Sequence, residues 1–259
     1  MSSHAQREDR TRAGCEAVFK DVSGCVRQLP WLKAAASVRF EELVPVASFP
    51  VIPGKRWAPG WWWSATTGRH VVHGSAAMRS QLMLLDRDPG VVGLAGRPLR
   101  VVWRDGQGRV RSWVPQLFAR YADGTALLAD CPAVPGGGGE GARLAAQYVG
   151  AACAEVGWVY QRLEPLDAVL TANIRWLAGY RHPRNAGGPQ RMAAVEDAFR
   201  DPRPLIEGVR AVGDPMAVWP AVFNALWAGR LTAPLSRPLH ERVAAGPGRP
   251  AGGTDGAAQ

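Results

Sequence analysis

Cysteine is scarce in this sequence, and its spacing excludes two common uses of the residue. No two cysteines form a CxxC pair, and none lies beside histidine at the spacing of zinc ligands, so no structural zinc is expected. Scattered cysteines are typical of buried, inert thiols in a reducing compartment. We therefore expect a cytoplasmic protein. The four cysteines are Cys15, Cys25, Cys131 and Cys153.

Long apolar segments are missing as well. No apolar run approaches the roughly 18 residues of a membrane span. The first residues, MSSHAQREDRTRAG, are polar and do not lead into the apolar region of a secretory signal. We expect no membrane partner. The glycine run at residues 135–139 lacks the GK[ST] ending of a phosphate loop, and no serine lies in a GxSxG motif, which argues against a nucleotide site and a serine hydrolase.

Acidic residues are absent from one long stretch, between Glu42 and Asp86. Over the whole chain, 31 Lys and Arg outnumber 22 Asp and Glu, which gives a formal charge of +9. Such a charge favours a polyanionic partner, and nucleic acid before membrane, because no basic amphipathic helix stands out. The alternative is that an arginine-rich and alanine-rich composition reflects a high-GC genome.

The chain is long enough, at 259 residues with 47% hydrophobic composition, to bury a sizeable core. Residues 69–131 form its centre. Met78, Leu82 and Leu85 are spaced i, i+4 and i+7, which predicts a helix. Pro89 should end this helix, since proline cannot continue the backbone hydrogen-bond ladder.

Three β-like runs follow the helix, at residues 99–103, 110–121 and 126–129. Asp123-Gly124, before the last run, is a strong hairpin signal. A helix followed by a meander that ends on Asp130 is the order of a restriction-endonuclease-like α/β core.

Flanking segments complete the expected organisation. Residues 15–33 are expected to form one or two helices, and residues 38–51 an extended segment. A helix at residues 142–156, a strand at 158–163 and a helix at 166–180 would complete the core. Three short helices at 190–199, 205–212 and 215–227, followed by LTAPLSRPL, fit either a winged-helix domain or a helical cap without DNA contact. The expected domains are 1–37 (polar or helical extension), 38–180 (nuclease-like), 189–239 (helical) and 240–259 (disordered tail).

Four segments carry a family resemblance: GWWWSATTGRHVVHGS, LMLLDRDPGVVGLAGRPL, VPQLFARYADGTALLADC and NIRWLAGYRHPR. They resemble the TnsA-like endonuclease subunits of heteromeric transposases in actinobacteria, over about residues 40–239. The resemblance implies metal-dependent cleavage of DNA strands at transposon ends. It also implies Mg²⁺ or Mn²⁺ as cofactor, double-stranded DNA as substrate, and a partner transposase subunit of the integrase-like class.

The catalytic positions of that family are altered here. The helix glutamate falls on Gly74 or Met78, and the acid of the middle strand on Gln116. The acid-x-base pair of the next strand is Asp130 with Pro132, so Asp130 is the one surviving candidate for catalysis and metal binding. The resemblance therefore implies a subunit that keeps its fold and contacts while hydrolysis is lost or reduced.

Other residues are weaker candidates for a metal site. Asp86, Asp88, Asp105 and Asp123 are expected to serve caps and turns, and His70 and His73 a structural role, rather than to bind metal. A nuclease with a rearranged site would instead bring acids such as Glu41, Glu42 or Asp86 to Asp130. A third interpretation is a DNA-binding adaptor derived from such a subunit, with no role in transposition; a neighbouring transposase gene would argue against it.

Basic residues are numerous around the core and are candidates for contacts with DNA phosphates, which supply affinity with little sequence information. The alternative is a solvated sheet face. Trp61, Trp62 and Trp63 either stack on bases or, as we expect, fill the flank of the core. The candidate DNA-binding residues are Lys55, Arg56, Arg69, Arg97, Arg109, Arg111 and Arg120, with Arg100 and Arg104 beside them.

Overall fold

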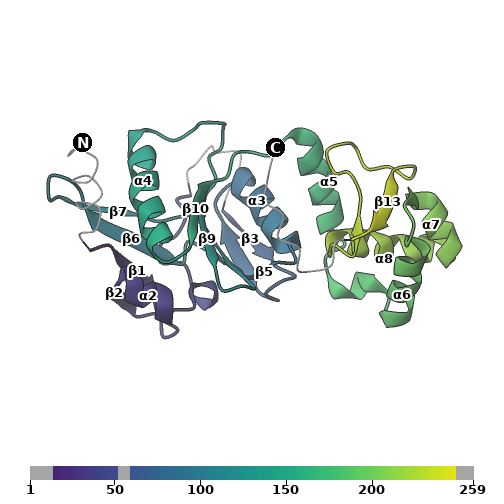
Figure 1. The fold of residues 1–259 in the computed structure, drawn as a ribbon, viewed down its shortest axis with the longest axis horizontal. Helices are drawn as coiled ribbons and strands as arrows, with labels where there is room; N and C mark the ends of the chain where they lie inside the picture. The colour runs from purple at the N-terminus through teal and green to yellow at the C-terminus, as the bar shows by residue number, and fades with distance from the viewer. Residues whose placement is uncertain (1–13, 52–58, 249–259) are drawn as a thin grey trace. The chain divides into compact units, whose positions relative to one another are not determined.

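The computed structural model describes residues 14–51 and 59–248. The chain is a mixed α/β protein, and its described residues fall into two compact units (Figure 1). Unit 1 takes the residues up to Leu82 together with Val91–Pro165, and unit 2 takes Met83–Gly90 together with the residues from Leu166 onwards. No helix in this described part is long and apolar enough to cross a membrane.

The first sheet of unit 1 contains the start of the described chain. Ala17 and Phe19 pair with Val101 and Leu99, and all four side chains are buried on one face. The expectation of helices over residues 15–33 is therefore wrong for most of that segment, because alternating burial against a partner strand overrides local helix propensity. A short helix, α2 (Trp31–Ser37), follows. The sheet order is β2 (Val26–Pro30), β1 (Glu16–Lys20), β6 (Leu99–Arg104) and β7 (Val110–Trp113).

The second sheet of unit 1 carries the residues of the candidate site. Its outer pair, β9 and β10, is parallel and is connected through α4 (Glu140–Glu155), whereas the other pairs are antiparallel. The expected run at residues 110–121 is two strands in different sheets, and the expected helix at 142–156 is confirmed. The order is β10 (Val159–Arg162), β9 (Ala126–Asp130), β8 (Leu117–Tyr121) and β5 (Val91–Gly96).

Aromatic rings form the centre of the unit 1 core. Phe40, which is fully buried, lies 5.8 Å from the ring centroid of Phe118 and 6.2 Å from that of Trp158. Trp158 also meets Trp31 edge to face at 5.6 Å. Phe40 begins a short 3-10 helix, η1 (Phe40–Glu42), where an extended segment was expected. The turn aims Phe40 into the core, which explains the difference.

A hairpin and the predicted helix complete unit 1. Strands β3 (Gly60–Trp63) and β4 (His70–His73) pair antiparallel and lead into α3 (Ala76–Arg87), whose last residues belong to unit 2. The predicted helix and its end before Pro89 are confirmed. Trp62 is buried, as expected for a residue filling the core flank, while Trp61 is 64% exposed.

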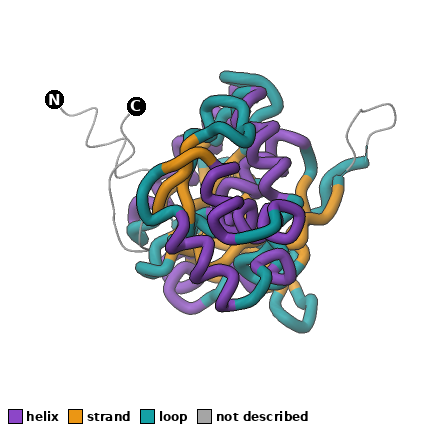
Figure 2. The backbone as a smooth tube through the Cα atoms, turned by 90° about the vertical axis from the view of Figure 1, so that its right-hand side faces the viewer, coloured by secondary structure: helices purple, strands orange, loops and turns teal. Residues whose placement is uncertain are grey.

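Unit 2 is mainly helical, and its helices appear as purple tubes in Figure 2. The four helices expected after residue 165 are confirmed, although α5 clusters with unit 2 rather than with the preceding unit. The expectation of a structureless tail is wrong for residues 244–247, which form β13 between two other short strands. The elements are α5 (Ala168–Ala178), η2 (Pro183–Ala186), α6 (Pro189–Ala198), β11 (Arg203–Pro204), α7 (Leu205–Val212), α8 (Pro215–Trp227), β12 (Leu231–Thr232) and β13 (Ala244–Pro247).

Candidate functional site

Asp130, the surviving candidate ligand, ends strand β9 and is only 7% exposed. Its Oδ2 accepts hydrogen bonds from the indole Nε1 of Trp113 at 2.6 Å and from the hydroxyl of Tyr160 at 2.5 Å. Its Oδ1 accepts the backbone N–H of Gln116 at 3.1 Å. Burial raises the pKa of Asp130, although these three donors and the charge of Arg162 oppose the rise. Both carboxylate oxygens therefore serve donors of the protein itself.

Gln116, at the position where the resemblance puts the middle-strand acid, also accepts hydrogen bonds from the protein itself. Its side-chain Oε1 accepts the backbone N–H of Cys131 at 3.0 Å, and its backbone oxygen accepts the N–H of Arg97 at 3.0 Å. The amide fastens the β7–β8 connection to the end of β9. Its oxygen already has a donor and brings no negative charge to a cation.

Neither candidate for the helix position is suited to a carboxylate, since Gly74 faces an aromatic ring and a charge at Met78 would be fully buried. A Cβ built on Gly74 would lie 2.1 Å from Cδ1 of Phe49, so the phenyl ring fills the space in front of the glycine. Met78 is fully buried, as the sequence predicted, and its sulfur accepts the N–H of Gly74 at 3.3 Å. The start of α3 is thus closed by an aromatic ring and a thioether.

Arg97 places a guanidinium beside this ring. Its Cζ lies 4.7 Å from the Phe49 ring centroid, and its Nη1 donates to the backbone oxygen of Ser48 at 2.7 Å. Arg97 is also the one non-glycine among the described residues with a left-handed φ, 52°. Burial lowers the pKa of Arg97, and the charge of Arg100 lowers it further, whereas Asp130 opposes both. Arg97 holds residues 46–49 in place rather than standing free for DNA.

The divalent metal that the family resemblance implies does not fit these residues. The oxygens of Asp130 and Gln116 have protein donors, Gly74 faces a ring, and Pro132 cannot replace a base. Within residues 14–51 and 59–248, no three His, Cys, Asp or Glu side chains gather in a way that could hold a metal ion. The rearranged acidic site is therefore not formed by the described residues.

Glu41 belongs to a separate ion-pair cluster. It is 8% exposed and lies 3.5 Å from both Arg39 and Arg120. The guanidinium of Arg120 also stacks over Phe118 and Trp158, at 5.0 and 4.8 Å from their centroids. Arg120 is therefore a packing residue, and its predicted contact with DNA is not supported by its position.

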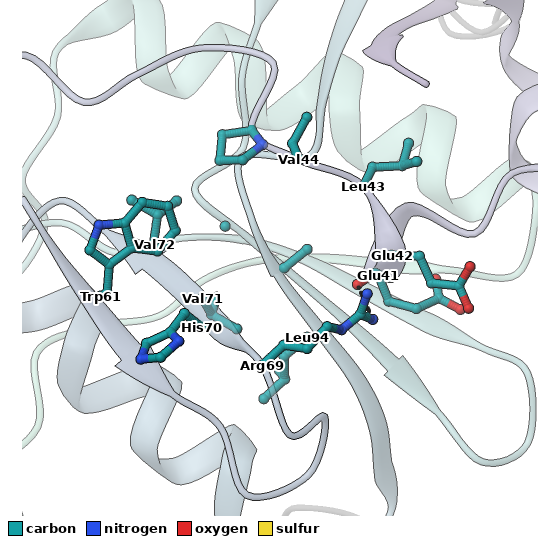
Figure 3. Close-up of a pocket in the computed structure, with 13 residues that line it drawn as sticks. Glu41, Glu42, Leu43, Val44, Trp61, Arg69, His70, Val71, Val72 and Leu94 are labelled. Atoms are coloured by element: carbon teal, nitrogen blue, oxygen red, sulfur yellow. Dashed lines mark hydrogen bonds between the residues drawn. The ribbon is translucent and has the colours of Figure 1, made fainter. Parts of the chain in front are cut away.

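A hollow of about 180 Å³ lies beside this cluster, between η1 and strands β4 and β5 (Figure 3). Its floor is apolar and includes Val71 and Leu94. Arg69 reaches across it and donates to the backbone oxygen of Glu41 at 3.4 Å. The exposed rings of Trp61 and His70 also line it. The hollow is thus lined by a cation and aromatic rings, and Glu41 and Glu42 add two acidic side chains.

Of the remaining basic residues predicted to bind DNA, some lie outside the described residues and the others are exposed on one hairpin. Lys55 and Arg56 lie outside the described residues. Arg109 and Arg111, on the β6–β7 hairpin, are 59% and 42% exposed, and the Nε of each lies 3.0 Å from Oδ2 of Asp105. Arg104 is also exposed and donates to the backbone oxygen of Gly108 at 3.1 Å. This hairpin is the part of the described chain where the predicted basic residues face solvent together.

Asp86 is buried in the last turn of α3, so the expectation that it follows the helix is wrong, whereas Asp88, Asp123 and the two histidines have local roles. Asp88 accepts the N–H of Gly90 at 2.8 Å, and Asp123 accepts that of Thr125 at 2.9 Å, as predicted for turn residues. His73 is buried, and burial followed by the charge of Arg79 lowers its pKa, which keeps the imidazole neutral. His70 is exposed on β4. The expectation of buried cysteines is confirmed for Cys131 and Cys153 and is wrong for Cys25, which is exposed.

Three residues of the site were not predicted: Trp113, Tyr160 and Phe49. Trp113 and Tyr160 lie on β7 and β10, and both donate to the same oxygen of Asp130. The only sequence signal was that each has a polar donor on an apolar ring next to the expected strand end. Phe49 lies 25 positions before Gly74, and nothing local to either residue indicates the contact.

Comparison with known proteins does not assign a family. No protein-family model matches the chain, and no match was found among curated proteins. The class that the structure defines is a mixed α/β protein of two units.

Proposed function

We propose that the chain is a TnsA-like subunit of a heteromeric transposase that binds duplex DNA and a transposase partner and does not itself hydrolyse the strand. The elements around the second sheet support the nuclease-like fold: they are α3, β5, β8, β9, α4 and β10 in chain order, with β6 and β7 of the other sheet inserted between β5 and β8. Strands β5, β8 and β9 pair antiparallel, and β10 follows α4 and lies parallel to β9. Four thiols without disulfides fit the reducing cytoplasm.

The observation that carries the loss of hydrolysis is the environment of Asp130. In a metal-dependent nuclease, carboxylates hold a divalent cation that polarises the phosphoryl oxygen and helps generate hydroxide. Here the carboxylate at that position accepts three hydrogen bonds from Trp113, Tyr160 and Gln116. Releasing an oxygen to a metal would leave a buried donor unsatisfied, at about 1–3 kcal/mol for each donor. Asp130 in this chain organises the strand ends.

The exposed arginines of the β6–β7 hairpin support the DNA-binding part of the proposal. Arg109 and Arg111 share one carboxylate, so two cations are held against a single negative charge. The pair keeps a net positive charge at the tip of a two-stranded ribbon, and Arg104 adds to it. Such a surface binds phosphates through charge and counterion release, with little preference for sequence.

A duplex-binding titration tests this surface. We expect the double variant Arg109→Ala, Arg111→Ala to bind a labelled duplex of about 30 base pairs about tenfold or more weakly, measured by fluorescence anisotropy. The slope of log affinity against log salt should become shallower by roughly 0.9 for each phosphate that the variant no longer neutralises. The matched control is Arg27→Ala, on the opposite edge of the same sheet, because Arg27 is 61% exposed and also paired with a turn aspartate. Equal weakening in both variants would contradict the location.

A calorimetric Mn²⁺ titration tests the absence of a metal site without requiring a partner subunit. We expect no binding heat from the wild-type chain or from Asp130→Ala. Binding that Asp130→Ala abolishes would instead indicate a rebuilt metal site, and would favour a working endonuclease.

A further inference from the structure

Helix α8 has a composition that separates it from DNA-reading helices. After α5, unit 2 continues α6, β11, α7, α8, β12, β13, so α8 is the last of the three helices α6, α7 and α8 and directly precedes β12 and β13. In helix-turn-helix and winged-helix proteins, a helix at this place enters the major groove, where polar and basic side chains read the base edges. The thirteen residues of α8, PMAVWPAVFNALW, include no charged side chain. Its one amide, Asn224, is buried and donates to the backbone oxygen of Tyr180 at 2.9 Å.

Large apolar side chains gather at the surface where α8 packs against α5. Met216 is 84% exposed and Trp176 is 56% exposed, values that are unusual for residues of this size. Exposed tryptophan, tyrosine, phenylalanine and methionine are enriched in protein interfaces. Trp176 and Met216 are exposed, and the neighbouring Tyr180, Trp219 and Phe223 are half-buried; we call these five residues the aromatic face.

The ring geometry of the aromatic face favours a protein over single-stranded DNA. Trp219 and Phe223 stack on each other, with centroids 5.0 Å apart and planes at 17°. Trp176 meets Phe223 edge to face at 5.8 Å, and Tyr180 lies 4.8 Å from Phe223. Base stacking requires a row of free ring faces, whereas these rings pack against one another. The surface they leave is suited to aliphatic and aromatic side chains of a partner.

The rim of the aromatic face is basic. Arg175 precedes Trp176 on α5, Arg184 lies on η2, which packs against α8, and both side chains are exposed. The Nη1 of Arg191 donates to the backbone oxygen of Ala217 at 2.8 Å, next to Met216. Neither α5 nor α8 contains an acid, and the caps Asp167 and Asp214 lie before their first residues. A second copy of this chain would bring the same positive rim, so charge disfavours self-association and favours an acidic partner.

We propose that the aromatic face docks an acidic segment with apolar anchor residues from a partner protein. The proposal rests on the protein-partner half of the proposed function and is independent of the DNA-binding half. The apolar anchors would cover Met216 and Trp176, and carboxylates of the same segment would meet Arg175, Arg184 and Arg191. Anchors of this kind supply most of the affinity of small interfaces, and rim charges set the specificity.

Selection from a displayed library of random peptides, about 16 residues long, on the full chain tests the proposal. We expect the selected peptides to be rich in Asp or Glu together with Leu, Phe or Trp. Trp176→Ala should weaken the best of them at least about tenfold. The control variant is Val159→Ala, since Val159 is also 56% exposed but lies on β10 of unit 1, and it should leave the affinity unchanged. Basic peptides, no selected peptide, or equal affinity for Trp176→Ala and the wild type would overturn the proposal.

Two further measurements cover the other occupants. If the wild type sediments as a dimer and Trp176→Ala as a monomer, the aromatic face binds a second copy of the chain. If the wild type binds a single-stranded oligonucleotide and Trp176→Ala does not, the aromatic face binds nucleic acid. Either result overturns the proposal. Duplex binding by the β6–β7 hairpin should be the same in wild type and Trp176→Ala. A failed peptide selection with duplex binding intact would therefore reject the docking surface alone.

Discussion

The phenyl ring of Phe49 occupies the space that a side chain at Gly74 would need, since a Cβ there would lie 2.1 Å from Cδ1. Gly74 is one of two positions where the family resemblance puts the helix glutamate. A longer side chain at Gly74 would have to displace this ring, so we expect that Gly74→Glu alone does not create a metal ligand. The guanidinium of Arg97 lies over the same ring at 4.7 Å and holds the segment that carries Phe49.

We expect Gly74→Ala to lower the free energy of unfolding by about 1–3 kcal/mol, because the added methyl group is forced against the ring. Gly106→Ala is the control, since a Cβ at Gly106 meets nothing within 4 Å. Phe49→Ala should remove the clash, so the double variant should show a coupling energy of about 0.5–3 kcal/mol in urea denaturation. Additive effects would contradict the contact.

In this region, features set by residues close in the sequence could be predicted, whereas contacts between residues far apart in the sequence could not. Met78 and Leu82 were placed on the buried face of a helix because their spacing is a local signal, and both are fully buried. The close approach of Phe49 to Gly74 joins positions 25 apart and leaves no local signal. The resemblance suggested which positions to compare with the family's catalytic residues, but it did not indicate that Phe49 lies against Gly74.

Two of the secondary-structure errors have a related cause. Residues 16–20 become a strand because Ala17 and Phe19 pair with Val101 and Leu99, which lie 84 and 80 positions later in the chain. Residues 244–247 are rich in glycine, alanine and proline, which locally indicates disorder. They form a strand because backbone groups of Pro204 and Leu231 provide partners.

Asp130 should make stability depend on pH in a specific direction. Burial raises its folded-state pKa above the usual value of 3.8, so the folded state binds more protons than the unfolded state above that value. Its contribution is therefore present below pH 3.8 and is lost as the pH rises through the folded-state pKa. The asparagine in Asp130→Asn has no group that titrates in this range. The free energy of unfolding of this variant should therefore decrease less between about pH 4 and 7 than that of the wild type.

Urea denaturation at several pH values across that window measures the difference. Asp130→Asn should also be less stable by about 1–3 kcal/mol near pH 4, since an amide cannot accept all three donors. Asp123→Asn is the control with the opposite sign, because the hydrogen bonds from Thr125 lower the pKa of Asp123. Parallel curves for the wild type and Asp130→Asn would contradict a buried carboxylate with a raised pKa.

Asp105 should limit the affinity of the β6–β7 hairpin for DNA. Burial acts to raise its pKa, but hydrogen bonds from Arg111, from the backbone of Arg109 and Gln107, and from the side chain of Arg109 lower it overall, so the group stays ionised. Asp105→Asn removes one negative charge next to two cations and should strengthen duplex binding by about two- to tenfold. Anisotropy at two salt concentrations measures the effect. Weaker binding by a folded Asp105→Asn would mean that the turn geometry matters more than the freed charge.

We expect only one of the four cysteine thiols to react with an alkylating reagent in the native chain. Cys25 is exposed, whereas burial raises the pKa of Cys15 to about 11 and that of Cys153 to about 12. We expect one equivalent of iodoacetamide to label the native chain at about pH 8, and Cys25→Ser to prevent it. Mass spectrometry of the intact chain counts the labels, and rapid labelling of Cys131 or Cys153 would contradict the packing around β9 and α4.

The most direct test of the proposed function is duplex DNA affinity measured with and without Mn²⁺. A metal-dependent nuclease binds the cation between its carboxylates and the DNA phosphate, so its duplex affinity changes when the metal is added. For this chain we predict salt-dependent binding whose affinity at constant ionic strength is the same, within about twofold, with and without about 5 mM Mn²⁺, as expected when arginines alone contact the phosphates. No duplex binding, or binding that requires Mn²⁺, would contradict the proposal of a DNA-binding subunit without a metal site.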